Sequence, residues 1–132
     1  MSTLAISMLV ATAALAQTPT LADNMKAIGG LFKSIAQNAN NAAQNQASQA
    51  SALQLATLFT ACKAQVPDAI TQMPSDQQAA AVADYQSMIQ SEIDAANSLA
   101  SAFGSSNNAQ AAQIIQQMTS TKQSGHSKYN PN

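Results

Sequence analysis

The sequence has little charge, few aromatic residues and almost no cysteine. Lysine and arginine together number 5 among 132 residues, all five are lysines, the formal net charge is -1, and tryptophan is absent. Without arginine or a basic cluster, the chain lacks the electrostatic footprint of a nucleic-acid-binding protein. The scarcity of aromatic rings also argues against a platform on which bases or sugars could stack.

Cys62 is the only cysteine, so an intramolecular disulfide is excluded. The sequence contains no C-x-x-C-H motif for covalent haem attachment, and the position of Cys62 within a helical pattern favours a buried small hydrophobe. Glu92 and Asp94 do not form a catalytic pair, because helix residues two apart point to different sides. No nucleophile–base pair, metal-binding cluster or phosphate-binding loop is evident, and we expect no enzymatic activity.

The first 16 residues are apolar or small and end in Ala14-Leu15-Ala16, a cleavage pattern typical of a secretory signal peptide. We therefore expect residues 1–16 to be removed on export, leaving residues 17–132 as one domain without stable membrane insertion. No lysine or arginine precedes the apolar run, so either the start is truncated or the signal is atypical. A retained membrane anchor is the alternative.

Apolar residues make up 46% of the chain and recur with helical periodicity. In the first helical stretch the apolar positions follow steps of four and three residues: Leu21, Met25, Ile28, Phe32 and Ile35. Four such stretches, joined by polar or proline-containing connections, predict an all-α, antiparallel up-down-up-down four-helix bundle. The expected helices cover residues 21–37, 42–65, 75–103 and 109–129, with a short helical turn at 69–73.

Local signals predict where these helices begin and end. Thr20 is expected to cap the first helix, with Asp23 in its first turn. Ser75 and Gln78 have the spacing of a capping box for the third helix. Gly104 is expected to terminate that helix.

His126, the only histidine, lies near the end of the fourth helix. The residues that share its face follow steps of four or three: Ala111, Ile115, Met118, Lys122, His126 and Tyr129. This spacing predicts that His126 faces the bundle interior or lies at the edge of that face. Taken alone, it is more simply interpreted as an ordinary residue of a helix end.

Bundle topology suggests a partner for His126. With an even number of antiparallel helices, the start of the first helix and the end of the last lie at the same end, which brings Met25 towards His126. A core methionine is the simpler interpretation of Met25. A thioether and an imidazole on opposite faces of a haem iron, however, form the Met/His pair of electron-transfer cytochromes, which raises the reduction potential. With both axial positions filled, electron transfer is favoured over dioxygen chemistry.

Several segments resemble the cytochrome b562 family. Leu21–Met25 and the apolar positions after it resemble the opening helix of that family, and Ile93–Ala100 resembles its third helix. Asn108–Ala112 and the ending His126–Tyr129 resemble its fourth helix. The resemblance implies a periplasmic, monomeric four-helix bundle that binds one non-covalent haem b per chain. It further implies that Met25 and His126 are the axial iron ligands and that a redox partner protein exchanges electrons with the haem.

The turns before His126 depart from the family pattern. Lys122 and Gly125 stand there in place of basic and aromatic residues, and Lys122 could attract a haem propionate only as a point charge. The third helix is expected to line the pocket with Val82, Tyr85, Gln86 and Ile89. The alternative function is therefore that of a haem-free, exported bundle that binds a partner protein or another ligand.

Overall fold

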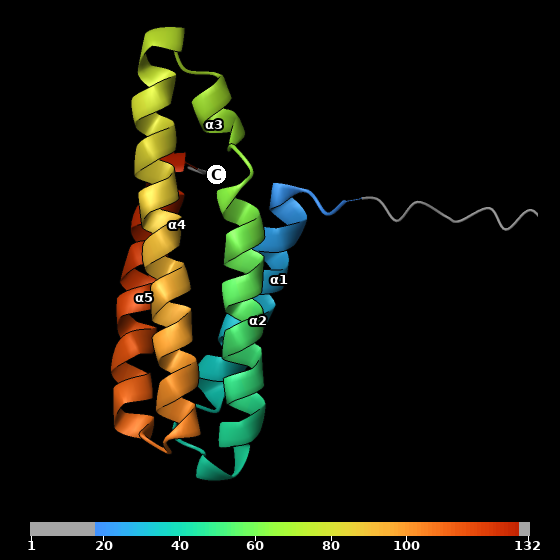
Figure 1. Cartoon of the computed structure of the whole chain (residues 1–132), viewed down its shortest axis with the longest axis vertical. Helices are drawn as coiled ribbons and strands as arrows, with labels where there is room; N and C mark the ends of the chain where they lie inside the picture. Colours follow the sequence, from blue (N-terminus) through green and yellow to red (C-terminus); the bar gives the residue numbers. More distant parts are fainter. Residues whose placement is uncertain (1–17, 130–132) are drawn as a thin grey trace, which may run out of the picture.

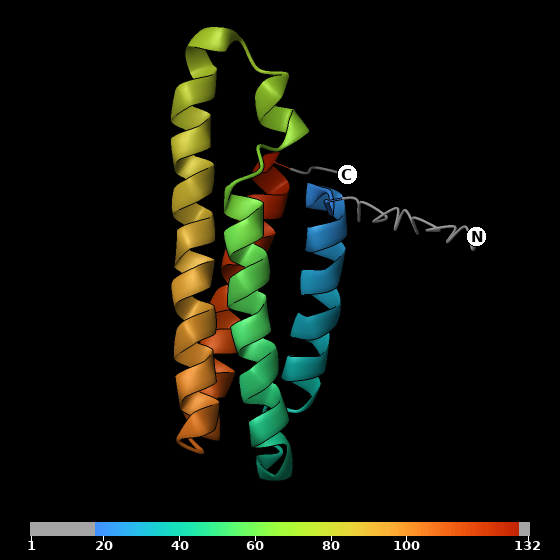
Figure 2. The same ribbon diagram turned by 45° about the vertical axis from the view of Figure 1, so that its right-hand side comes forward.

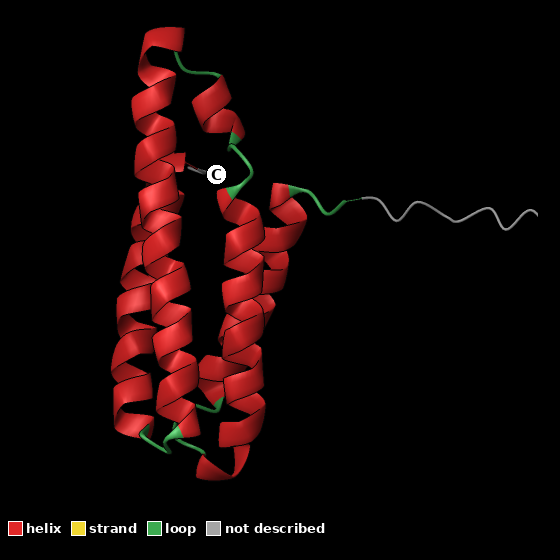
Figure 3. Cartoon of the chain, viewed as in Figure 1, coloured by secondary structure: helices red, strands yellow, loops and turns green. Residues whose placement is uncertain are grey.

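The computed structural model describes residues 18–129, so the predicted signal peptide lies outside the described residues. Four long helices form the structure: α1 (Leu21–Gln37), α2 (Asn45–Lys63), α4 (Ser75–Gly104) and α5 (Asn108–Tyr129). A 3-10 turn, η1 (Ala42–Gln44), precedes α2, and a short helix, α3 (Asp68–Thr71), lies in the connection to α4. Figure 3 shows that this part of the chain contains helices and loops without strands. The predicted all-α four-helix bundle is confirmed.

The helices run antiparallel in chain order, and they do not all pack equally closely. α2 packs along α4, α1 packs mainly on α2, and α5 packs mainly on α4, whereas α1 and α5 stand further apart. Figures 1 and 2 show the start of α1 and the end of α5 at the same end of the bundle. The topology thus agrees with the prediction, and the two helices that bear Met25 and His126 make few contacts with each other. None of the helices between residues 18 and 129 is long and apolar enough to span a bilayer.

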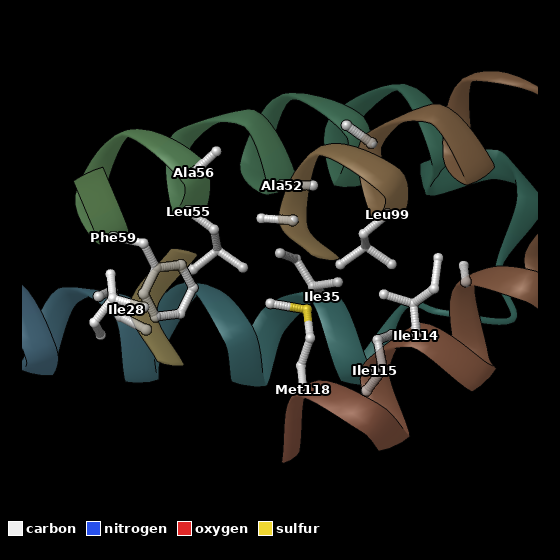
Figure 4. Close-up of a cluster of buried hydrophobic side chains, with 14 of the residues drawn as sticks. Ile28, Ile35, Ala52, Leu55, Ala56, Phe59, Leu99, Ile114, Ile115 and Met118 are labelled. Atoms are coloured by element: carbon white, nitrogen blue, oxygen red, sulfur yellow. The ribbon is translucent and has the colours of Figure 1, made fainter. Parts of the chain in front are cut away.

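A single apolar core runs along the interior of the bundle (Figure 4). Its largest side chains with almost no exposed surface are Phe103, Ile35, Leu55, Ile70, Leu99, Met118 and Cys62. Cys62 is buried as predicted, and burial raises the pKa of its thiol to about 11. The thiol therefore acts as a small apolar group of the core rather than as a nucleophile.

The cap of α1 forms as predicted, whereas the predicted cap of α4 does not. At α1 the Asp23 amide donates to the Thr20 hydroxyl, and the Thr20 amide donates to the Asp23 carboxylate, both at 3.1 Å. At α4 the capping residue is Pro74, and the predicted capping box of Ser75 and Gln78 is absent. The Gln78 amide instead donates to the carbonyl oxygens of Thr71 and Met73, at 3.2 and 2.9 Å, and so fastens the preceding turn to α4.

Gly104 ends α4 as expected, but not by adopting a left-handed conformation. The left-handed residue is Ser106, with a φ of 56°. The Ser106 amide donates to the carbonyl of Phe103, and the Asn107 amide donates to the carbonyl of Ala102 at 2.8 Å, which is the Schellman pattern. A Cβ on Gly104 would lie 2.6 Å from the side-chain nitrogen of Gln49, so a larger residue there would require the Gln49 side chain to move.

A pair of asparagines joins α2 and α5 at the end of the bundle opposite the start of α1. The Asn108 side-chain amide donates to the Ala39 carbonyl at 2.7 Å and to the Asn45 side-chain oxygen at 2.8 Å. Asn45 returns a hydrogen bond to Asn108 at 3.1 Å and is itself buried. These three hydrogen bonds satisfy polar groups that the fold removes from water.

Substituting Asn108→Ala is expected to destabilise the bundle by about 1–3 kcal/mol, because it leaves a buried amide and a carbonyl without partners. Urea unfolding followed by circular dichroism measures the change. Asn97→Ala on the exposed face of α4 is the matched control and should change the free energy of unfolding by less than about 0.5 kcal/mol. Equal effects of the two substitutions would refute the role given to the asparagine pair.

Candidate functional site

A large cavity lies where α1 begins and α5 ends. Its volume is about 970 Å³, near the upper end of the range of roughly 300–1,000 Å³ that is usual for cofactor sites. Apolar side chains from three long helices form much of its wall, including Ile28 of α1, Phe59 of α2, and Met88 and Ile89 of α4. Residues of α3 and of the loop before it, including Pro67, complete the wall. The cavity can therefore hold a large, mostly apolar ligand.

Met25 lines this cavity from the second turn of α1. The predicted apolar stripe is rotated by one residue here, because Asn24 is the buried position and Met25 is 39% exposed. The Asn24 side-chain amide donates to Gln65 at 2.9 Å, and Gln65 donates to the Pro19 carbonyl at 3.0 Å, which ties the start of α1 to the end of α2. The Met25 side chain is thus partly exposed on a helix start that hydrogen bonds hold in place.

His126 lines the same cavity from the last turns of α5. Its side chain is exposed, so it lies at the edge of the inward face, the second of the two positions that the spacing allows. It also borders a smaller recess beside Phe32 of α1. The structure therefore brings the two predicted ligands, Met25 and His126, to one cavity from two different helices.

The last turn of α5 is fastened to α4 by two side chains that follow His126. The Tyr129 hydroxyl donates to the Asp84 carboxylate, and the Lys128 ammonium contacts the same carboxylate at 2.9 Å. The hydrogen bonds from Tyr129 and Lys128 hold the pKa of Asp84 below its usual range. The Tyr129 ring packs edge-on against Tyr85, with 5.8 Å between centroids, and the Tyr85 hydroxyl donates to the Cys62 carbonyl at 2.7 Å. The position of His126 is thereby set by contacts that reach α2.

The departures from the family pattern at Lys122 and Gly125 now have a structural context. A Cβ on Gly125 would lie 3.0 Å from the terminal methyl of Met88, so glycine leaves room for that methyl. The Lys122 ammonium lies 5.6 Å from the centroid of the Phe32 ring, within the range of a cation–π contact, and so bridges α5 and α1. Lys122 also lines the cavity, where it is a positive charge on an otherwise largely apolar wall.

The prediction for the third helix, α4 in the structure, is partly wrong. Tyr85 and Ile89 line the cavity as expected, but Gln86 is exposed, and neither Gln86 nor Val82 is part of the cavity wall. Met88 and Glu92 line it instead. The face of α4 that meets the cavity is thus rotated relative to the expected one.

Glu92 is a buried, charged cavity residue that the spacing of apolar residues did not predict. Its side chain is only 5% exposed, and this burial raises its pKa to about 7, against the lowering effects of Lys122 and Thr121 on α5. A signal existed in the sequence, because the buried positions of α4 follow steps of four and three that include residue 92: Tyr85, Ile89, Glu92, Ala96, Leu99 and Phe103. A glutamate on that buried stripe is unusual, since glutamate is rarely buried completely, and it indicates a position with a role beyond core packing.

The residues of the cavity fit a haem. The thioether of Met25 and the imidazole of His126 are a donor pair used for haem iron, and they enter the cavity from separate helices. The apolar wall suits a porphyrin ring, and Lys122 offers a positive charge for a propionate. The fit therefore rests on donor chemistry, cavity size and polarity together.

The fold and the cavity define a class: four-helix bundles with room for a flat prosthetic group between two splayed helices. The model of the cytochrome b562 family matches residues 20–130. This chain belongs to the cytochrome b562 family, a family of haem-binding helical bundles. Comparisons with curated proteins and with solved structures give no match.

Proposed function

We propose that this protein is an exported one-electron carrier that holds one haem b non-covalently, with Met25 and His126 as the axial ligands. One observation supports the proposal above all others: Met25 and His126 line the same cavity, from the first turns of α1 and the last turns of α5. A bound haem would supply the one-electron couple of its iron. We propose no enzymatic activity.

The side chains around the cavity have different roles in the proposed haem binding. The sulfur of Met25 is a soft ligand that stabilises the reduced iron and raises the potential, and the His126 nitrogen is the second ligand. Phe59, Ile28 and Ile89 would cover the ring faces and exclude water. Lys122 would attract a propionate as a point charge.

The protein is proposed to act in the periplasm as a monomer that meets a redox partner protein. Export is supported by the predicted signal at residues 1–16 and by the family. The small number of charges, 8% of residues, leaves little surface charge to steer association. We therefore expect recognition of the redox partner to depend weakly on salt concentration.

A second function is favoured by one observation: the side chains of Met25 and His126 are both exposed. A bundle that has lost its cofactor could use the same cavity for another apolar ligand. Because Glu92 lines that cavity, such a ligand would also have to accommodate a carboxyl group beside it.

Haem titration of the purified mature protein distinguishes the two functions. We expect uptake of about one haem per chain, a low-spin absorption spectrum, and sharp bands after chemical reduction. The double variant Met25→Ala, His126→Ala under the same conditions controls for non-specific haem uptake. A protein that stays colourless after gel filtration with excess haem would refute the first function and favour the second.

A further inference from the structure

Glu92 lies at the centre of α4 and lines the cavity that Met25 and His126 also line. It is 5% exposed, and burial raises its pKa against the smaller lowering effects of Lys122 and Thr121, both on α5. Neither Met25 nor His126, the two predicted iron ligands, is among the groups that shift the pKa of Glu92. A carboxyl group in this place is neither a helix cap nor a surface charge.

The other charged or titratable groups around the cavity come from four elements. They are Lys26 of α1, Asp68 of α3, Tyr85 of α4, and Lys122, His126 and Tyr129 of α5. The wall contributed by α2 is the ring of Phe59, which bears no charge. Of the carboxyl groups that line the cavity, Asp68 is exposed and Glu92 is buried, so a change of charge inside the cavity acts most strongly on Glu92.

We propose that Glu92 is a proton-binding site coupled to the haem, so that the protein takes up a proton together with its electron. This inference rests on the proposed function, because it requires a redox group in the cavity. It adds proton-coupled electron transfer to an otherwise simple carrier.

The coupling follows from electrostatics in a poorly solvated site. A bound haem would carry one more positive charge when oxidised, and that charge would favour the Glu92 carboxylate. When a donor protein supplies one electron, Glu92 would form an O–H bond with a proton taken from solvent. When the electron leaves to an acceptor, that O–H bond would break and the proton would return to solvent. Lys122 opposes full protonation, and the raised pKa of Glu92 brings the exchange close to neutral pH.

The midpoint potential measured as a function of pH tests the proposal. In the wild-type protein the potential should fall as pH rises through the near-neutral range, with a limiting slope of about 59 mV for each tenfold change in proton concentration. In Glu92→Gln, which keeps the shape and the hydrogen-bonding capacity of the side chain, that slope should be lost. Asp94→Asn, which removes an exposed carboxylate two residues away on α4, is the matched control and should keep it.

A second measurement does not need haem. A carboxyl group whose pKa is raised by folding binds more protons in the folded state, so stability is greatest below the unfolded pKa and falls as pH rises towards the folded pKa. For Glu92 this window runs from the ordinary value of 4.5 to about 7. The haem-free wild-type protein should lose urea resistance across that window, whereas haem-free Glu92→Gln should lose less.

The outcomes separate this inference from the proposed function. A wild-type potential that does not vary with pH, or a slope that persists in Glu92→Gln, overturns the coupling while leaving the electron carrier intact. A protein that takes up no haem overturns both, even if the haem-free stability still depends on Glu92. Identical stability profiles of wild type and Glu92→Gln overturn the proton site itself, whatever the haem does.

Discussion

Substituting His126→Ala is expected to remove the low-spin haem spectrum and to weaken haem binding by at least about 100-fold. Losing a residue that only hydrogen-bonds to a metal ligand already weakens metal binding by about 10- to 100-fold, so losing the ligand itself should cost at least as much. His126 would supply the only nitrogen ligand, and no second histidine exists in the chain to replace it. Its side chain is exposed and makes none of the contacts that fasten the end of α5. The haem-free variant should therefore unfold within about 0.5 kcal/mol of the wild type.

Absorbance titration with haem measures the affinity, and urea unfolding of the haem-free protein measures the stability. Ser124→Ala, an exposed substitution on the same turn, is the matched control for both. Met25→Ala should give the same loss of the low-spin spectrum, because one axial position would then lack its ligand. An unchanged spectrum in either ligand variant would show that the iron is held by other residues.

Substituting Phe103→Ala is expected to destabilise the bundle by about 3–5 kcal/mol, since the change removes a buried ring and leaves a cavity. Phe103 is 1% exposed and lies near the end of α4, at the opposite end of the bundle from the haem cavity. A domain of this size has roughly 5–15 kcal/mol of stability in total. The loss should lower the midpoint of thermal unfolding by at least about 10 °C.

Differential scanning calorimetry of the haem-free protein measures this change. Leu53→Ala, at a side chain that is 49% exposed on α2, should change the free energy of unfolding by less than about 0.5 kcal/mol. The folded fraction of Phe103→Ala should still bind haem with the wild-type spectrum, because the substitution leaves the cavity wall intact. A loss of stability no larger than that of Leu53→Ala would contradict the assignment of Phe103 to the core.

The architecture was predictable because it depends on repeated, redundant signals. The bounds of α1 agree with the prediction, and the other long helices agree to within three residues. Many apolar positions contribute to each helical stripe, so one misassigned residue does not change the topology. The same topology placed Met25 and His126 at one end without any knowledge of their side-chain contacts.

The details of the site were less predictable because they depend on single residues. Successive helix residues are about 100° apart, so periodicity alone leaves the orientation of a face uncertain by about one residue. For that reason Asn24 is buried and Met25 is exposed. In the same way, Glu92 is buried on α4 and the neighbouring Ile93 is only partly buried. Asparagine becomes acceptable in the interior because Gln65, which is distant in sequence, accepts its hydrogen bond. Such a partner cannot be found from local spacing.

Because the last turn of α5 is attached to α4, the backbone around His126 becomes ordered when the protein folds rather than when a ligand binds. Tyr129 and Lys128 meet Asp84 through side chains of the chain itself, so the backbone entropy of this turn is lost during folding. A ligand that binds the cavity has the two exposed side chains, Met25 and His126, to immobilise, at a cost of about 0.5–1.5 kcal/mol for each. The attachment thus transfers an ordering cost from ligand binding to folding.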